Sequence, residues 1–349
     1  METINILFRC DASPEIGLGH VTRCLALADE LRSVHGCGIS FAMRKGPLGF
    51  NLVKERGHEV IVSREEDREF DYGIWLLDCV ERINAQVIVF DVRDGLKREV
   101  VKKLRDSSRL IIDIDDPEDK RLEADLVFYP PVPQVQRMSW EGFSGELFAG
   151  WEWVLLRKEF SEIPEIKKGR HHFQILVTMG GSDPEGMTLA AVEALQGLDK
   201  DFKAVIALGR GFQYEDELDQ LLSQDSRKFF EVRKDVVDMA ALMYESDLAI
   251  ASFGVTAYEL AAMGVPALYL CLTEDHHESA SIFVKGGVAV SQRFTPATKS
   301  VLADTVKNFM SDILHHSRMS RLAREKVDGK GVERVARLIL LNLSKNRRF

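Results

Sequence analysis

The sequence lacks any long hydrophobic run. No apolar stretch approaches the roughly 18 uninterrupted residues that a membrane span requires. The N-terminus also lacks the basic segment and apolar core of a secretory signal, because residues 4–8 already have the pattern of a strand. We therefore expect a cytoplasmic protein with no membrane span.

Cysteine is scarce, and its spacing is uninformative. The five cysteines are odd in number, scattered, and never arranged as Cys-x-x-Cys. This pattern indicates neither a disulfide framework nor a zinc site. We expect reduced thiols, no metal and no cofactor.

An excess of positive charge is also missing. The chain has 46 Lys and Arg against 55 Asp and Glu, a formal net charge of −9. Such a balance opposes a general polyanion-binding surface, so nucleic acid is not an expected partner. A small phosphate ligand remains compatible with it, because helix N-termini and backbone N–H groups bind phosphate without much net positive charge.

What is present is the composition of a globular protein and the length of two domains. The 349 residues are 45% hydrophobic and 29% charged. Short apolar runs alternate with helix-period segments, which predicts an α/β protein of two Rossmann-like domains whose parallel sheets face a central cleft. The expected strands are Ile4–Phe8, Ile39–Met43, Glu59–Val62, Val87–Phe90, Leu110–Asp113 and Leu126–Phe128, then Phe173–Thr178, Lys203–Leu208, Phe229–Val232, Leu248–Ala251, Ala267–Leu270 and Val288–Val290.

A proline-bearing, charged stretch near the middle of the chain marks the domain boundary. We assign residues 1–163 to an N-terminal Rossmann-like domain with a catalytic loop and residues 164–171 to a linker. Residues 172–349 form a C-terminal Rossmann-like, nucleotide-binding domain. Its last part, from about Pro296, is predicted to be a helical tail.

The first strand is followed by a glycine turn that leads into a helix. Gly17 and Gly19 at this turn allow a ligand to approach the unpaired N–H groups of the helix start, which predicts a site for an anion. The dinucleotide fingerprint fails, because Thr22 occupies its third glycine position. The second strand ends in Arg44 and Lys45, where an NAD enzyme needs a carboxylate. A dehydrogenase is therefore a weak alternative.

His20 lies where this loop becomes the helix, at the carboxyl end of the first strand. The helix dipole there disfavours the imidazolium form, so His20 is a candidate general base near pH 7. The competing interpretation is a histidine that only caps the turn. Asp11 is the nearby carboxylate: it could orient the imidazole, bind a sugar hydroxyl, or accept loop N–H groups.

Two glycine turns in the second half have the pattern of a nucleotide pocket. Gly180, Gly181, Ser182 and Asp183 precede a helix and predict an N-terminus that holds a diphosphate, although a plain capped turn has the same pattern. The second turn contributes the residues Gly254, Val255 and Glu259. The carboxylate of Glu259 could bind both ribose hydroxyls, or Glu259 could simply be a solvated glutamate of the helix.

Other acidic and histidine patterns do not predict a metal. Asp113 and Asp115 match the Asp-x-Asp pattern of metal-dependent sugar transferases, but they follow a buried strand, so a turn at the strand end is the better interpretation. The pairs His276-His277 and His315-His316 are adjacent on helices and share no face. His276 is still expected to border the cleft.

Together these residues resemble a known family. The chain is similar to the UDP-sugar hydrolases of pseudaminic acid biosynthesis, often labelled spore-coat polysaccharide biosynthesis proteins, and to the B-type glycosyltransferases. The motifs that carry the resemblance are Arg9-x-Asp11, Ile16-Gly17-x-Gly19-His20-x-x-Arg23-Cys24-Leu25-x-Leu27-Ala28, Leu155-Leu156-Arg157-x-Glu159-Phe160, Gly180-Gly181-Ser182-Asp183-Pro184, Gly254-x-x-x-x-Glu259, Gly264-Val265-Pro266 and Asp328-Gly329-x-Gly331-x-x-Arg334.

The resemblance implies a reaction and roles for residues. The reaction is metal-independent hydrolysis of a UDP-linked diacetamido-trideoxyhexose with inversion, which yields free sugar and UDP. His20 would activate water, with Asp11 beside it, and Arg23 is counted among the substrate-binding residues. The turns at Gly180–Asp183 and Gly254 would hold the diphosphate, and Glu259 the ribose.

Two segments depart from the family pattern. Members usually carry an Asn-Gln pair where this chain has Thr273–Glu278, so we count Asp275 and His276 as substrate-facing residues of a changed wall. An Asp-Ser-Tyr turn is replaced by Phe90–Asp94, which lacks the tyrosine. Both changes fall where the sugar would be selected, so the sequence leaves the identity of the sugar open, as it does the oligomeric state.

Two other functions compete with hydrolysis. A B-type glycosyltransferase would use the same cleft and deprotonate an acceptor hydroxyl, and Phe41–Phe50 is the one stretch that hints at an acceptor patch. A non-catalytic nucleotide-sugar binding protein is the other alternative. The presence of His20 argues against it.

Overall fold

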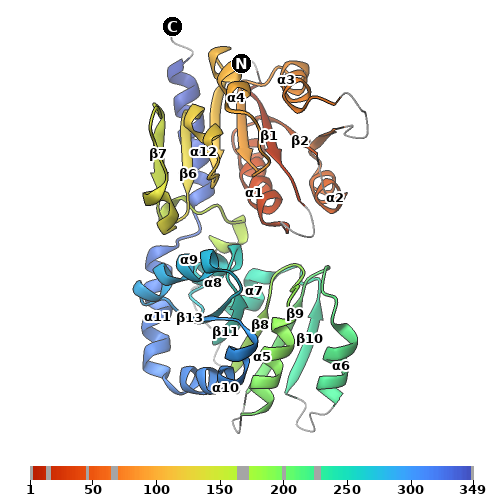
Figure 1. Cartoon of the computed structure of the whole chain (residues 1–349), viewed down its shortest axis with the longest axis vertical. Coiled ribbons are helices and arrows are strands. Elements are labelled where there is room, and N and C mark those ends of the chain that lie inside the picture. Colours follow the sequence, from red (N-terminus) through yellow and green to blue (C-terminus); the bar gives the residue numbers. More distant parts are fainter. Residues whose placement is uncertain are drawn as a thin grey trace. The chain divides into compact units, whose positions relative to one another are not determined.

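The computed structural model describes residues 3–12, 17–44, 47–63, 70–162, 173–198, 202–223 and 229–346. The chain divides into two compact units: unit 1 comprises residues 1–157 and 330–349, and unit 2 comprises residues 158–329 (Figure 1). The linker predicted at 164–171 lies outside the described residues.

The described strands of unit 1 form a seven-stranded sheet in the order β3-β2-β1-β4-β5-β6-β7, with every neighbouring pair parallel. Their bounds are β1 Asn5–Cys10, β2 Gly38–Met43, β3 Glu59–Val62, β4 Val87–Asp91, β5 Leu110–Ile114, β6 Leu126–Tyr129 and β7 Glu146–Ala149. The central strands are apolar along almost their whole length, as strands of a parallel sheet covered on both faces must be.

Helices cover both faces of this sheet. One apolar core joins the sheet to α1 and α12, and a second core on the opposite face joins it to α3 and α4. The helices of unit 1 are α1 Gly19–Ser33, α2 Pro47–Glu55, α3 Tyr72–Arg82, α4 Arg98–Asp106 and α12 Gly331–Asn346, with short 3-10 helices η1 Asp119–Glu123, η2 Pro133–Arg137 and η3 Trp151–Trp153.

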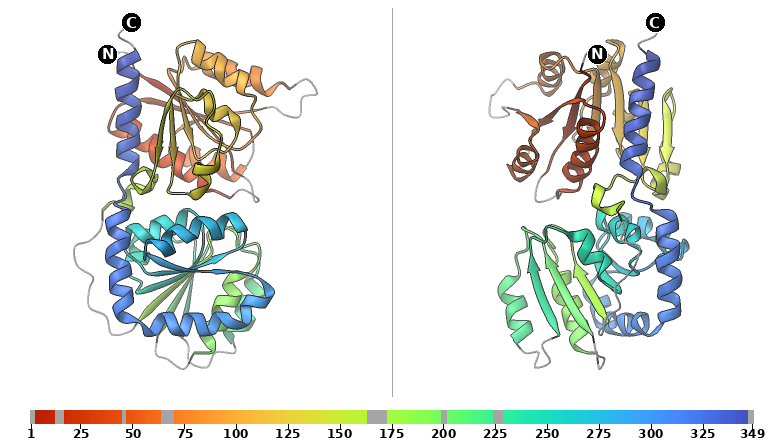
Figure 2. Two further views of the ribbon diagram at one scale, coloured as in Figure 1. Left: turned by 60° about the vertical axis from the view of Figure 1, so that its left-hand side comes forward. Right: turned by 180° about the vertical axis from the view of Figure 1, so that it is seen from behind.

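The last helix belongs to unit 1, whereas the sequence had placed the whole C-terminal tail with the second domain. Val335 and Ile339 of α12 are fully buried in the core that contains α1, and the helix runs along unit 1 (Figure 2). Gly331 makes this approach possible, because a Cβ there would meet the carbonyl oxygen of Val154 at 2.1 Å. Strand β7 is a further element absent from the predicted strands.

Unit 2 has a second parallel sheet, in the order β10-β9-β8-β11-β12-β13. Its strands are β8 Gln174–Thr178, β9 Lys203–Leu208, β10 Phe230–Lys234, β11 Leu248–Ser252, β12 Ala267–Cys271 and β13 Ala289–Arg293. Its helices are α5 Met187–Gln196, α6 Glu215–Ser223, α7 Met239–Tyr244, α8 Val255–Ala262, α9 Glu274–Lys285, α10 Pro296–Ser311 and α11 Ile313–Lys326, with η4 Lys158–Phe160 before the sheet. The predicted α/β class with two parallel sheets is confirmed.

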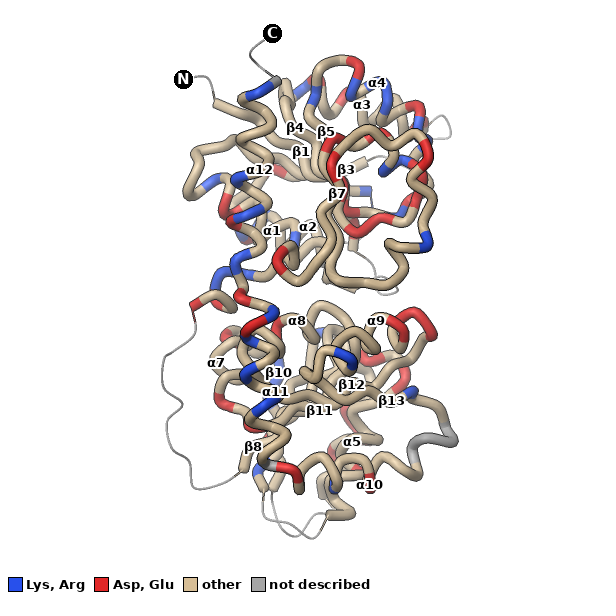
Figure 3. Tube along the Cα trace, turned by 90° about the vertical axis from the view of Figure 1, so that its left-hand side faces the viewer, with Lys and Arg blue, Asp and Glu red and all other residues tan. Residues whose placement is uncertain are grey.

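Charged residues of both signs are present in each unit. Basic and acidic residues both occur along the trace of each unit (Figure 3). Within the described ranges, no helix combines the length and apolar character needed to cross a membrane.

Candidate active site

The carboxyl ends of β1 and β4 mark the point where the strand order of unit 1 reverses. From β1 the chain proceeds to β2 on one side of the sheet, and β4 lies on the other side. Ligands of open α/β sheets bind at such a switch point. The register pairs Cys10 at the end of β1 with Asp91 at the end of β4, so side chains that follow β1 reach Asp91 there.

His20 lies at this point, in the first turn of α1, and its partner is Asp91. Nδ1 of His20 is 2.5 Å from Oδ1 of Asp91. The carboxylate is fully buried, while the His20 side chain is 20% exposed. An ionised carboxylate accepts the proton on Nδ1 and leaves the lone pair of Nε2 as the basic site, which is the base-and-orienter arrangement of general base catalysis.

Arg23, one turn along α1, binds the same carboxylate. Its Nε donates to Asp91 Oδ2 and its Nη2 to Oδ1, both at 2.6 Å, and its Nη1 donates to Asp115 Oδ2 at 3.0 Å. Burial by itself would raise the pKa of Asp91, but Arg23 and then His20 lower it below its ordinary value. The Arg23 guanidinium therefore binds two protein carboxylates, those of Asp91 and Asp115.

Asp11, the carboxylate that the sequence placed beside His20, bonds elsewhere. Its Oδ2 accepts from Nη2 of Arg9 at 2.7 Å, and its Oδ1 accepts from the backbone N–H of Arg44 at 2.7 Å. The residue that sequence reasoning missed is therefore Asp91. The sequence could have pointed to Asp91 through its position, because it ends the strand that is expected next to β1 in a doubly wound sheet.

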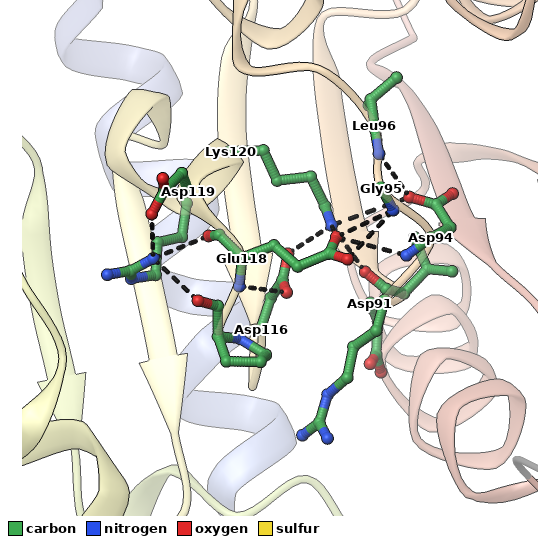
Figure 4. A network of polar contacts seen from close by, with 12 residues as sticks. Asp91, Asp94, Gly95, Leu96, Asp116, Glu118, Asp119 and Lys120 are labelled. Atoms are coloured by element: carbon green, nitrogen blue, oxygen red, sulfur yellow. Dashed lines mark hydrogen bonds and ion pairs between the residues drawn. The ribbon is translucent and has the colours of Figure 1, made fainter.

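The loop that follows β4 is held by a buried ionic cluster, shown in Figure 4. The Lys120 Nζ donates to the Val92 carbonyl at 2.9 Å, lies 2.6 Å from Asp116 Oδ2, and donates to Glu118. Glu118 in turn accepts from the backbone N–H of Asp94 at 3.3 Å. Lys120, in η1, thus ties the segment after β5 to the loop that follows Asp91.

The first glycines of the predicted site lie beside this base. Gly17 has φ +70°, in the left-handed region that glycine adopts without strain, and Gly19 is the first residue of α1. No side chain caps this helix, and its first turn holds no acidic residue. Residues 13–16 of the loop lie outside the described residues.

In unit 2, the turn after β8 is closed by its own aspartate. Asp183 is 3% exposed, and its two carboxylate oxygens accept from the backbone N–H groups of Met187 and Thr188, each at 2.8 Å. A negative side chain therefore occupies the start of α5. Among the described residues, no acceptor binds the backbone N–H groups of Gly181 and Ser182, which precede it.

The turn after β11 leaves its helix start open. Gly254 is the N-cap of α8, no side chain caps this helix, and a Cβ on Gly254 would meet no atom within 4 Å. Val255 is the first helical residue. Glu259 lies on the second turn and is only 8% exposed, so it is largely buried rather than solvated. Of the two turns, the start of α8 is thus the better place for an anion.

Asp275 and His276 lie in the first turn of α9, after β12. Thr273 caps this helix, its hydroxyl accepting from the backbone N–H of His276 at 3.1 Å. Asp275 is exposed. The imidazole of His276 lies 6.3 Å from the ring of Phe253, the residue before Gly254. Burial lowers the pKa of His276, which favours a neutral imidazole beside the start of α8.

Comparison with known proteins finds relatives at 24–30% sequence identity. No protein-family model matches it. It is 30% identical to an uncharacterized protein of Methanocaldococcus jannaschii over 284 residues, which are 79% of this chain, but the chain spans only 57% of that protein. It is 25% identical to the spore coat polysaccharide biosynthesis protein SpsG of Bacillus subtilis over 94% of this chain and 96% of SpsG. It is 24% identical to the UDP-2,4-diacetamido-2,4,6-trideoxy-beta-L-altropyranose hydrolase of Campylobacter jejuni, over 83% of this chain and all of that enzyme.

Solved structures identify the fold. MurG of Acinetobacter baumannii matches with a TM-score of 0.71 at 16% identity, over 97% of this chain and 99% of MurG. The MnaA–UDP complex of S. aureus matches with a TM-score of 0.67 at 13% identity, over 98% of both chains. The spinosyn rhamnosyltransferase SpnG matches with a TM-score of 0.64 at 15% identity, over 95% of this chain and 99% of SpnG. The chain therefore has the B-type glycosyltransferase fold of two Rossmann-like domains.

Proposed function

We propose that this protein hydrolyses a UDP-sugar to free sugar and UDP, without a metal ion and with inversion at the anomeric carbon. The observation that carries the proposal is the pair formed by His20 and Asp91 at the switch point of unit 1. A neutral histidine whose Nδ1 is bound by a buried carboxylate can accept a proton only on Nε2. The resemblance to the Campylobacter jejuni hydrolase supports the same reaction.

The reaction needs one base and a stabilised leaving group. His20 Nε2 takes a proton from water as the water oxygen bonds to the anomeric carbon. The bond from that carbon to the β-phosphate oxygen breaks on the opposite side, so the configuration inverts and UDP leaves with the electron pair. A positioned general base contributes about 10²–10⁴-fold to such a step.

Unit 2 supplies the nucleotide site in this proposal. The backbone N–H groups at the start of α8 bind the diphosphate and stabilise the charge that develops as UDP departs. The N–H groups of Gly181 and Ser182 are further donors, while Asp183 shapes their turn by capping α5. Glu259 accepts hydrogen bonds from the ribose hydroxyls.

The sugar we propose is of the 2,4-diacetamido-2,4,6-trideoxy-β-L-altropyranose type, after the substrate in the name of the Campylobacter jejuni relative. The first turn of α9, with Asp275 and His276, would contact it. This segment departs from the pattern of the family, so the sugar is the part of the proposal that the first experiment must decide.

That experiment follows purified protein by proton NMR with UDP-2,4-diacetamido-2,4,6-trideoxy-β-L-altropyranose and, in parallel, UDP-N-acetylglucosamine. We expect release of UDP from the first substrate, with the inverted anomer formed first. If neither sugar is released but UDP binds, the nucleotide site is right, the sugar assignment is wrong, and acceptors are screened next. That screen is warranted because MurG and the spinosyn rhamnosyltransferase share the fold. If UDP does not bind at all, the nucleotide-sugar assignment is wrong.

Gly254→Ala is expected to weaken UDP binding about tenfold while leaving thermal stability unchanged. The added methyl group should displace the diphosphate enough to cost one charge-assisted hydrogen bond, and the loss of one such bond weakens affinity by about tenfold. The added methyl group meets no protein atom, yet it projects where the anion would lie. Isothermal titration calorimetry measures the affinity. The matched control is Gly197→Ala at the C-terminal end of α5, where φ is −71° and an added Cβ has its nearest neighbour at 3.5 Å, so both UDP affinity and melting temperature should stay unchanged. Unchanged affinity in Gly254→Ala would move the diphosphate away from α8.

Glu259→Gln is expected to weaken UDP binding about tenfold and to affect 2′-deoxy-UDP much less, because a hydrogen bond to a charged acceptor is worth about 1.5–3 kcal/mol. Competition binding with the two nucleotides separates the ribose contact from a general effect on unit 2. An equal loss for both nucleotides would show that Glu259 acts on the fold of α8 and not on the 2′-hydroxyl.

A further inference from the structure

We propose that Arg23 is a positioning residue for the base: by pairing with both oxygens of Asp91, it lets this carboxylate orient His20 without holding the imidazole in its protonated form. The inference rests on the proposed function for its catalytic meaning. Its geometric basis is independent of any substrate.

The contacts place Arg23 between the carboxylate and the ring. Its guanidinium forms a two-point pair with Asp91, at 2.6 Å for each bond, and the same Nη2 lies 3.1 Å from His20 Nδ1. The Arg23 side chain is 12% exposed and Asp91 is fully buried, so water screens the pair poorly. A carboxylate and a guanidinium at these distances act on the imidazole as a nearly neutral pair.

Without the guanidinium, Asp91 would favour a charged histidine. An ionised carboxylate 2.5 Å from an imidazole stabilises the imidazolium ion, and an imidazolium cannot accept a proton from water. With Arg23 in place, Asp91 still accepts the Nδ1 proton and orients the ring, but its charge is already balanced. Asp115 fixes Arg23 from the other side, at 3.0 Å.

The other titratable groups near Asp91 and Arg23 are Cys24 of α1, Cys10 of β1, Asp113 of β5 and Asp115, which follows β5. Cys24 donates its thiol proton to Asp91 Oδ2 at 3.4 Å, and burial raises the pKa of that thiol, so it stays neutral. Burial and then Asp116 raise the pKa of Asp113, which favours its neutral acid. Asp91, Arg23 and Asp115 are therefore the charges that determine the protonation of His20.

The test is an NMR titration of His20 in protein labelled with ¹⁵N-histidine, recorded without substrate. In Arg23→Gln we expect the titration midpoint of His20 to rise by about one pH unit or more, because an unbalanced carboxylate stabilises the imidazolium. Arg23→Lys, which keeps the charge, should return the midpoint to near that of the wild type. In the double variant Asp91→Asn/Arg23→Gln the rise should disappear, since both charges are gone.

The matched control is Arg32→Gln, at the other end of α1. Arg32 is 42% exposed, donates to the carbonyl oxygens of Gly57 and Arg56 and pairs with Asp29, so its loss should leave the midpoint unchanged. If Arg23→Gln does not fold, Arg23→Met provides a second neutral replacement of similar length. An unchanged midpoint in the neutral variants, an equal rise in Arg32→Gln, or a rise that persists in the double variant would overturn the proposal.

The same variants carry an activity readout. The acid limb of the profile of kcat/KM against pH should move upward in Arg23→Gln by the shift seen in the NMR titration. Failure of the wild type to hydrolyse any UDP-sugar would reject the proposed function. The titration without substrate would still decide the role of Arg23.

Discussion

Replacing His20 with alanine is expected to lower kcat for UDP release by about 10²–10⁴-fold, the contribution of a positioned general base. UDP affinity should stay close to that of the wild type, because the proposal assigns the nucleotide to unit 2. Asp91 would lose its imidazole partner but keep both bonds to Arg23, so unit 1 should remain folded. Proton NMR of UDP release, with calorimetry for UDP binding, measures the two effects separately.

The control for this variant is His35→Ala. His35 is exposed just beyond the end of α1, on the same stretch of chain, and should be replaceable without loss of activity. Activity of His20→Ala within a few-fold of the wild type would show that another group activates water. A parallel loss of UDP binding would instead indicate that His20 contacts the nucleotide.

Replacing Lys120 with methionine is expected to destabilise unit 1 by about 3–5 kcal/mol, the cost of removing one partner from a buried ion pair. Lys120 is 1% exposed, and its ammonium group contacts Asp116, Glu118 and the Val92 carbonyl. Methionine fills the space of the stem, but it leaves the carboxylates without their cation. We also expect weaker hydrolysis, because the loop that follows Asp91 would lose its anchor.

Tryptophan fluorescence measures this effect on unit 1 alone. All four tryptophans, Trp75, Trp140, Trp151 and Trp153, lie within residues 1–157. Urea unfolding of Lys120→Met is compared with Arg82→Met, which removes an exposed ion pair with Glu59 in the same unit and should change the midpoint little. Equal midpoints for the two variants would mean that the buried cluster contributes no net stability.

The local elements were accessible from the sequence because their signals are local. Apolar runs of four to six residues predicted the strands near β1, β8 and β11, and each is a strand in the structure. The glycines before α1 and α8 predicted two helix starts, which the structure also has. The period of the hydrophobic pattern, the turn residues and the helix caps all depend on residues close together in the sequence, so these elements can be predicted from a single sequence.

Elements that depend on distant partners escaped the same reasoning. β7 is an edge strand with exposed residues on both faces, so it lacks the apolar run of a buried strand. α12 has the sequence of an ordinary amphipathic helix, and nothing local says which core receives it. Its place in unit 1 depends on the apolar side chains of α1, some 300 residues earlier in the chain.

The α/β class, the two parallel sheets and the position of His20 at a helix start after the first strand follow from the order of the amino acids alone. The groups that act on that histidine are known only once the chain is folded. Asp91 and Arg23 meet His20 only because the parallel pairing of β1 with β4 brings residues about 70 positions apart to one edge of the sheet. Strand register and burial are set by packing across the whole unit, and these two properties determine how strongly each charge is felt at His20.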